Sequence, residues 1–404
     1  MPSAGASLFW IALIAVLAPL AAGFVPRRLL PEVVLLLVFG MIVGPNVLDL
    51  AVDGPEVDLL RELGLGMLFL LAGFEIDVSE ITGRGGRRAL VTWTISLLAA
   101  FGAVFLLGQS GAMSAEIAVA IALTSTALGT LLPILKDSGL QKTPLGRTVI
   151  NHGAIGELGP VIAMAVLLGA RGDVESIVIL ALFVVAAVAV GFIPMSLRRE
   201  GSKLLAVIRR GAATTAQTTV RLTMLLLITL TSIATVFGLD IILGAFAAGF
   251  ILRRLVPTGN EVLETKLEGL AFGFLIPIFF VTSGMSIDIG AVLAKPGILV
   301  VFLGLLVLVR GVPVFVATRF DREGGFDTRE QIRVALYATT GLPLIVAVTG
   351  VAVDAGQMST ANASILVAAG AITVLVLPML ATLMAAPGDA TPSRSHPRRQ
   401  EPES

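Results

Sequence analysis

Thirteen predominantly apolar runs follow one another along most of the chain, and this succession limits the fold more than any other feature. A bilayer core is crossed by about 17 to 25 helical residues, so each run predicts a transmembrane helix. Charged residues make up 14% of the chain, whereas soluble domains carry about 25%. Since lipid offers no partners to backbone N–H and C=O groups, we expect an all-α polytopic membrane protein.

The predicted spans form an ordered series. The first six cover approximately 8-25, 30-45, 60-77, 89-108, 116-136 and 143-169. The seventh covers 176-197, and the last six cover 218-238, 240-256, 266-289, 297-318, 331-353 and 360-384. The first span is expected to remain in the mature protein, because the N-terminus lacks the basic flank and the small-residue cleavage site of a secretory signal.

Lysine and arginine are distributed unequally between the loops that join these spans. Alternate loops, starting with the one after the first span and ending with the C-terminal segment, hold 24 of the 28 basic residues. The opposite loops hold 3, and the remaining one, Arg310, lies inside a span. Cytoplasmic loops are enriched in Lys and Arg, so we expect a plasma-membrane protein with its N-terminus outside and its C-terminus in the cytoplasm.

A long basic segment at 198–221 separates the first seven spans from the last six. This spacing predicts one transmembrane domain, 1–384, built from a first repeat at about 8–169, a linking helix at about 176–197 and a second repeat at about 218–384. One extra helix between two six-helix units makes the repeats inverted, and such repeats place substrate sites near the membrane midplane. The remaining segment, 385–404, predicts a disordered cytoplasmic tail.

The fifth span of each half contains a cluster of hydroxyl, glycine and proline residues. Ser125 and Thr126 lie in the first cluster, and Thr339 and Thr340 precede Gly341 in the second. Each cluster alone is ordinary in membrane helices, but their matched positions favour two helices that are broken at membrane depth and cross each other. Broken helices leave positive N-terminal and negative C-terminal ends at the bilayer centre.

Two ionisable residues lie near the centres of their spans, Glu157 in the sixth and Arg310 in the eleventh. A charge at the bilayer centre is costly unless it faces a cavity or a partner, so both are functional candidates. A permanently protonated or purely structural carboxylate is the alternative for Glu157. Glu75, Asp77 and Asp288 lie at span ends, where interfacial capping explains them.

Other chemistry is not expected. The chain has no cysteine and two histidines, without a closely spaced histidine–carboxylate cluster, so neither a metal centre nor a cofactor is expected. No nucleophile–base constellation is visible, so the chain is not expected to be an enzyme, and no nucleic-acid partner is expected.

These residues resemble the monovalent cation/proton antiporter-2 family, which includes bacterial Na+/H+ exchangers and potassium-efflux antiporters. The resemblance covers about residues 8 to 384 and is carried by segments 68–77, 122–128, 151–160 and 277–288 and by the surroundings of Arg310. It implies the sodium/proton antiporter fold, with a mobile core domain and a dimerisation domain that work by elevator-type alternating access. It also implies a homodimer and assigns ion binding to Glu157. Electrogenic members have paired aspartates where this chain has Gly156 and Glu157.

A single carboxylate that holds either a proton or a cation predicts exchange of Na+ or K+ for H+ by competition. Arginine does not release its proton, so the exchange is expected to be electroneutral, with Arg310 pairing with Glu157 or balancing helix ends. Neutral oxygen ligands are expected from Thr126, Thr339 and Thr340, and Asn151, His152 and Ser125 are further candidates. Two other functions remain open: a cation-coupled symporter of an organic anion bound by Arg310, and a non-transporting membrane sensor.

Overall fold

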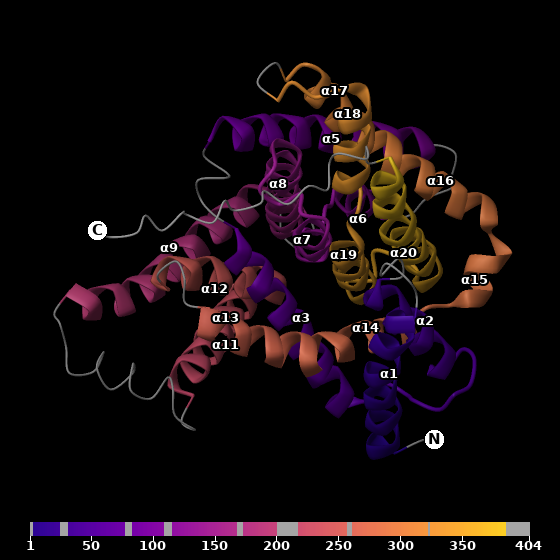
Figure 1. Ribbon diagram of the computed structural model, residues 1–404. Helices are drawn as coiled ribbons and strands as arrows, with labels where there is room; N and C mark the ends of the chain where they lie inside the picture. The colour runs from indigo at the N-terminus through magenta and orange to yellow at the C-terminus, as the bar shows by residue number, and fades with distance from the viewer. Residues whose placement is uncertain are drawn as a thin grey trace, which may run out of the picture.

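The computed structural model describes residues 3–24, 31–76, 83–108, 115–167, 173–199, 217–256, 261–321 and 324–384, and every regular element in these ranges is a helix (Figure 1). The fold class expected from the apolar runs is therefore confirmed for the described part of the chain. Asp77, most of the basic segment 198–221 and the predicted tail 385–404 lie outside the described residues.

Every predicted span overlaps a helix or a series of helices. The single helices are α1 (Ala4–Phe24), α2 (Glu32–Val43), α3 (Pro55–Glu75), α5 (Arg84–Gly108), α8 (Pro144–Leu167), α9 (Asp173–Arg199), α11 (Thr218–Val236), α12 (Ile241–Leu255) and α20 (Thr360–Leu383). Among the described residues, eight helices are long and apolar enough to cross a membrane and three shorter apolar helices accompany them. The count of thirteen crossings stays a prediction.

Four spans are interrupted. The fifth consists of α6 (Glu116–Leu123) and α7 (Leu128–Asp137), and the twelfth of α18 (Thr328–Ala338) and α19 (Leu342–Asp354). The tenth runs through α13 (Glu261–Leu270), the π-helical turn η2 (Ala271–Leu275) and α14 (Ile276–Met285), followed by the short α15 (Ile289–Ala294). The eleventh runs through α16 (Pro296–Leu306), the π-helical turn η3 (Val307–Gly311) and α17 (Val312–Arg319).

The two breaks expected at membrane depth are present, and they cross each other. The backbone N–H of Ala127 in the first break donates to the carbonyl oxygen of Thr340 in the second, at 2.7 Å. At Gly341 a Cβ would lie 2.7 Å from the carbonyl oxygen of Ser125, so only glycine permits this approach. Pro343 opens the second half-helix, where its missing N–H is not needed. The crossing thereby satisfies backbone groups that lipid could not.

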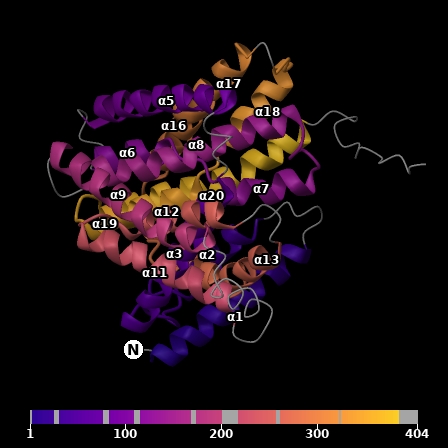
Figure 2. The ribbon, with the colours of Figure 1, turned by 90° about the vertical axis from the view of Figure 1, so that its left-hand side faces the viewer.

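The helices form two groups, which lie in the upper and lower parts of Figure 1. We call the first group the core body; it contains both broken helices and comprises α5, α6, α7, α8, α16, η3, α17, α18, α19 and α20. We call the second group the scaffold body; it comprises α1, α2, α3, α11, α12, α13 and α14. Figure 2 shows the two groups one above the other from a second direction.

Two helix crossings hold the scaffold body together through glycine. Between α2 and α14, a Cβ at Gly40 would lie 2.2 Å from the carbonyl oxygen of Val281, and one at Gly284 would lie 2.3 Å from that of Leu37. Between α3 and α12 the same arrangement joins Gly73 to Phe246 at 2.2 Å and Gly249 to Leu70 at 1.9 Å. In each pair, both glycines lie three residues after the carbonyl that the other glycine approaches. For example, Gly40 follows Leu37 by three residues, and the Leu37 carbonyl oxygen faces Gly284. Small residues of this kind let helix backbones approach closely.

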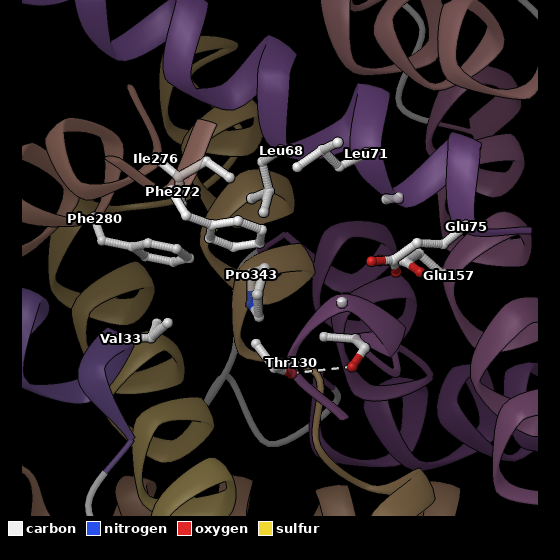
Figure 3. A pocket seen from close by; sticks show the side chains of 13 residues that line it. Val33, Leu68, Leu71, Glu75, Thr130, Glu157, Phe272, Ile276, Phe280 and Pro343 are labelled. Carbon is white, nitrogen blue, oxygen red and sulfur yellow. Dashed lines mark hydrogen bonds between the residues drawn. The ribbon is translucent and has the colours of Figure 1, made fainter. Parts of the chain in front are cut away.

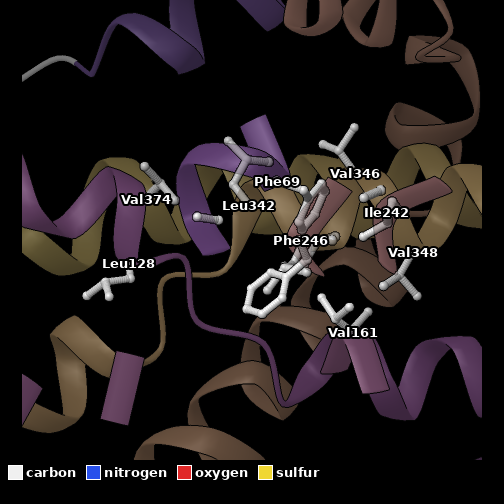
Figure 4. Packing of buried hydrophobic residues seen from close by; sticks show 14 of the residues in the cluster. Phe69, Leu128, Val161, Ile242, Phe246, Leu342, Val346, Val348 and Val374 are labelled. Atoms are coloured by element: carbon white, nitrogen blue, oxygen red, sulfur yellow. The ribbon is translucent and has the colours of Figure 1, made fainter. Parts of the chain in front are cut away.

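An apolar layer lies where the two bodies meet. Phe69 of α3 and Phe246 of α12 are buried, and Figure 4 shows them among Val161, Leu342 and Val346 of the core body. These side chains belong to one cluster that extends through both bodies. At this layer the two bodies therefore pack through apolar side chains, held by burial and van der Waals contact.

Candidate ion-binding site

Glu157 lies in the interior of α8, and its side chain is 4% exposed. One carboxylate oxygen accepts a hydrogen bond from the backbone N–H of Leu128, which is the first residue of the half-helix α7. The first N–H groups of a helix lack partners and carry partial positive charge, so the break places a positive helix end against the carboxylate. The other oxygen, Oε2, is buried without a protein hydrogen-bond partner.

Glu75 is a second carboxylate at this site, contributed by the last residue of α3 in the scaffold body. Its Oε2 is also buried without a hydrogen-bond partner, and Figure 3 shows the Glu75 and Glu157 carboxylates turned toward each other. The interpretation of Glu75 as an interfacial cap is therefore wrong. A sequence signal existed, because Leu68, Leu71, Ala72 and Glu75 have the spacing of one helix face.

A small cavity of about 30 Å³ lies between the two bodies, in contact with both carboxylates; we call it the inner cavity. A volume of roughly 10–15 Å³ is enough for one water molecule, so this cavity has room for a water or a dehydrated monovalent cation. Its polar residues besides the two acids include Thr130. Its apolar lining residues are Val33, Leu68, Leu71, Ala72, Ala127, Phe272, Ile276, Phe280 and Pro343.

Arg310 is fully buried and binds the crossing of the broken helices rather than Glu157. Its Nη2 donates to the carbonyl oxygen of His152 at 2.8 Å, and its Nε lies 3.0 Å from Oγ1 of Thr126 and 3.4 Å from the carbonyl oxygen of Ala338. Ala338 is the last residue of the half-helix α18, where the helix dipole is negative. Of the two roles expected for Arg310, its contacts match the balancing of a helix end. Within the described part of the chain, Arg310 forms no ion pair with Glu157.

Two local features turn Arg310 inward. The residue lies in η3, and a π-helical turn inserts an extra residue that shifts the side-chain direction relative to the preceding helix. The guanidinium then occupies space that Gly156 leaves open, since a Cβ at Gly156 would lie 2.4 Å from Nη2 of Arg310 and 2.5 Å from Oγ1 of Thr126. Glycine beside Glu157 therefore makes room for the arginine.

The threonine and serine candidates hold the two breaks instead of lining the inner cavity. The Thr126 hydroxyl donates to the carbonyl oxygen of Ala338. The hydroxyls of Thr339, Thr340 and Ser125 donate to carbonyl oxygens in the preceding turn, at 2.7–2.8 Å. Thr130, which sequence reasoning did not single out, does line the cavity, and its hydroxyl donates to the carbonyl oxygen of Ala127. Ligand roles for the four candidates stay predictions.

The other two candidates lie on different sides of α8 from Glu157. Asn151 packs against the first turn of α5, because a Cβ at Gly85 would lie 2.2 Å from its Nδ2. His152 is buried, its carbonyl oxygen accepts from Arg310, and its Nδ1 has no hydrogen-bond partner. Neither side chain lines the inner cavity. Asp288, in contrast, is the cap expected from the sequence, since it accepts from the backbone N–H of Ala291 at the start of α15.

The geometry provides an oxygen-lined site for a small cation or for protons. Hard monovalent cations favour carboxylate, hydroxyl, carbonyl and water oxygens, and the two unpartnered carboxylate oxygens are of this type. Each of the same oxygens also accepts a proton. The cavity is small, and apart from Thr130 the rest of its wall is apolar, so a cation and a proton would occupy the same carboxylate oxygens.

Comparison with known proteins supplies the family context. A family model described as "Sodium/hydrogen exchanger, transmembrane" matches residues 12–386. YjbQ of Bacillus subtilis, which carries a provisional Na+/H+ antiporter name, is 26% identical over 370 residues, with 87% of this chain and 58% of YjbQ covered. The Na+/H+-K+ antiporter GerN of Bacillus cereus is 25% identical over 353 residues, with 85% of this chain and 87% of GerN covered.

A solved structure matches along most of both chains. The sodium proton antiporter MjNhaP1 from Methanocaldococcus jannaschii superposes with a TM-score of 0.59 at 18% identity, covering 93% of this chain and 96% of that one. At this identity the match establishes a shared fold. The chain spans 58% of the length of YjbQ, so the activity of that whole relative is not transferred by the alignment alone.

Proposed function

Because the chain belongs to the sodium/hydrogen exchanger family, we propose that it is a secondary transporter that exchanges Na+ or K+ for protons across the plasma membrane. The observation that carries the proposal is the inner cavity, where two buried carboxylate oxygens, from Glu157 and Glu75, face each other without protein partners. The GerN name couples both Na+ and K+ to antiport, and the site chemistry suits either cation.

We propose that Glu157 is the group that travels with the ion. It lies on the core body, so movement of that body relative to the scaffold would carry the carboxylate across the membrane with a proton or a cation bound. Glu75 lies on the scaffold body and would stay behind. Only one carboxylate then crosses, and Arg310 keeps its charge in both directions, so the exchange is one for one and electroneutral.

Several contacts support the finer architecture of the proposal. The two glycine crossings, α2 with α14 and α3 with α12, are the pairs that an inverted 6+1+6 repeat would make equivalent. Arg88 at the start of α5 pairs with Asp321 after α17, so two of the basic loops meet on one side, as the proposed cytoplasmic location of both requires. We also propose a homodimer in the lipid bilayer, with the N-terminus outside.

The inner cavity disfavours a symporter of organic anions. Arg310, the basic residue near the centre of a span, does not line this cavity, and its Nε and Nη2 donate to protein oxygens in the crossing of the broken helices. A cavity of about 30 Å³ has no room for an organic carboxylate. Uptake of an organic anion into vesicles driven by an inward cation gradient would favour the symporter, and absence of any flux in correctly folded protein would favour a sensor.

The test is Glu157→Gln, which keeps the side-chain shape and removes the exchangeable charge. In everted vesicles with an imposed proton gradient, addition of Na+ or K+ should dissipate the gradient for the unmodified protein and fail to do so for Glu157→Gln. The matched control is Glu56→Gln, an exposed carboxylate in the first turn of α3, which should retain exchange. Undiminished exchange by Glu157→Gln would overturn the assignment.

A further inference from the structure

We propose that Phe279 and Phe280 of α14 form an apolar barrier, one helical turn thick, between the inner cavity and a second cavity that is the ion's path to the outside. This inference rests on the proposed function, because it assigns the external half of the transport path. The barrier would be closed in the present conformation.

The second cavity is large and polar; we call it the outer cavity. Its volume is about 320 Å³, roughly ten times that of the inner cavity. Ser283 and Ser286 of α14, Thr349 of α19 and Ser364 of α20 contribute hydroxyl groups to its wall. Water therefore has both the space and the hydrogen-bond partners to fill it, in contrast to the largely apolar wall around Glu157.

Four charged residues from three parts of the chain lie around the outer cavity. Arg61 and Glu62 come from α3, Asp240 caps α12, and Asp354 ends α19. All of these positions, and the start of α20, belong to the side opposite the basic loops, which the proposed topology places outside. Three carboxylates against one guanidinium give the cavity a net negative charge, which raises the local concentration of cations.

Three helices, α3, α14 and α19, contribute to both cavities, so the separation between the cavities can be located. On α14, Phe280 lines the inner cavity, and Phe279 and Ser283 line the outer one. On α19, Pro343 lines the inner cavity and Val346 the outer one. Three residues of helix rise about 4.5 Å, so a single turn on each helix separates the two spaces.

That turn is apolar and closed. Phe279, Phe280 and Val346 are 4%, 1% and 7% exposed. The two phenylalanine rings are tilted at 59° with centroids 5.0 Å apart, so they pack as a pair. An ion would have to shed its water to cross apolar side chains that offer no oxygen ligands, which is strongly unfavourable. In this conformation the barrier therefore isolates Glu157 from the outer cavity.

The chain has no cysteine, so single-cysteine reporters can be introduced without removing native thiols. Ser283→Cys reports on the outer cavity and Thr130→Cys on the inner one. Each variant would be treated in intact cells with a membrane-impermeant thiol reagent, and total thiol would be measured after denaturation. We expect labelling of Ser283→Cys from outside and at least tenfold slower labelling of Thr130→Cys.

The barrier is tested by adding Phe280→Ala to the Thr130→Cys reporter. Labelling from outside should rise at least tenfold, whereas Phe274→Ala, at an exposed position on the same span that lines neither cavity, should leave it unchanged. Phe280→Leu should give an intermediate rise in the labelling of Thr130→Cys. It replaces Phe280→Ala in the test if the alanine variant is not recovered in the membrane.

Three results would overturn the inference: external labelling of Thr130→Cys as fast as that of Ser283→Cys with the barrier intact, no rise on shortening Phe280, or no external labelling of Ser283→Cys. Labelling requires no transport. Failure of exchange in vesicles would therefore count against the proposed function, while the accessibility pattern decides on the barrier separately.

Discussion

At the scale of single residues, Glu75 is the least anticipated part of the site. If it holds the cation together with Glu157, Glu75→Gln removes one charged ligand from a buried site, a loss of about 1.5–3 kcal/mol, so KM for the cation should rise roughly tenfold or more. Initial rates of cation-dependent proton-gradient dissipation in everted vesicles provide the measurement. Glu56→Gln on the same helix is the control, and an unchanged KM would remove Glu75 from the ligand set.

Gly156 gives a second prediction at this scale. A Cβ at this position meets the Arg310 guanidinium and the Thr126 hydroxyl, so Gly156→Ala must displace groups that hold the two broken helices. Overpacking of this kind costs about 1–3 kcal/mol. We expect a lower thermal unfolding midpoint for Gly156→Ala in detergent. Gly102→Ala, where a Cβ meets nothing within 4 Å, is the matched control. Equal midpoints for the two variants would contradict the packing role.

The residues that could be identified from sequence are those that are costly in lipid. Glu157 is prominent as the only acidic residue of its span and Arg310 as the only charged residue of its span, and the structure buries both. Glu75 lies at a helix end, where a carboxylate is ordinary, and only the crossing of α3 over the core body reveals its partner. The hydroxyl of Thr126 was predicted as an ion ligand from its type, whereas three-dimensional contacts show that it also serves Arg310.

At the scale of helices, the glycine crossings of the scaffold body predict where small changes are not tolerated. At Gly249 a Cβ would lie 1.9 Å from the carbonyl oxygen of Leu70. This oxygen belongs to the backbone, which cannot move aside as a flexible side chain can. Gly249→Ala should therefore destabilise the protein by at least the ~1–3 kcal/mol of ordinary overpacking, and separate α12 from α3. Detergent-solubilised protein would show a lower unfolding midpoint or loss of the monodisperse peak, again against Gly102→Ala. A tolerated alanine at Gly249 would show that this contact is not close.

The helical breaks could be predicted, and the π-helical turns could not. Pro343 lacks a backbone N–H, and the preceding Thr339–Thr340–Gly341 favours non-helical backbone. The local sequence therefore predicts the break. The turns η2 (AFGFL) and η3 (VLVRG) are apolar stretches like the rest of their spans, except for Arg310, which has tertiary partners in the crossing of the broken helices. A single sequence carries no local sign of such partners.

At the scale of the whole molecule, the apolar runs predicted an all-helical protein and the matched breaks predicted crossed broken helices. The family resemblance implied the antiporter type of fold, which the structural match to MjNhaP1 confirms. In the proposed mechanism, the division into two bodies decides which charges cross the membrane. The carboxylate of Glu157 and the guanidinium of Arg310 belong to the core body and Glu75 to the scaffold. A loaded site therefore has the same net charge whether it carries a proton or a monovalent cation.

That equality predicts a transport equilibrium independent of voltage. Moving one elementary charge through 100 mV is worth about 2.3 kcal/mol, so an exchanger that moved one net charge per cycle would reach a different cation gradient when the potential changed. For this protein in proteoliposomes with a fixed pH difference, the final Na+ gradient should be the same with and without an imposed potential of about 100 mV. A shift of the gradient with potential would mean that net charge crosses in each cycle, which contradicts a single travelling carboxylate.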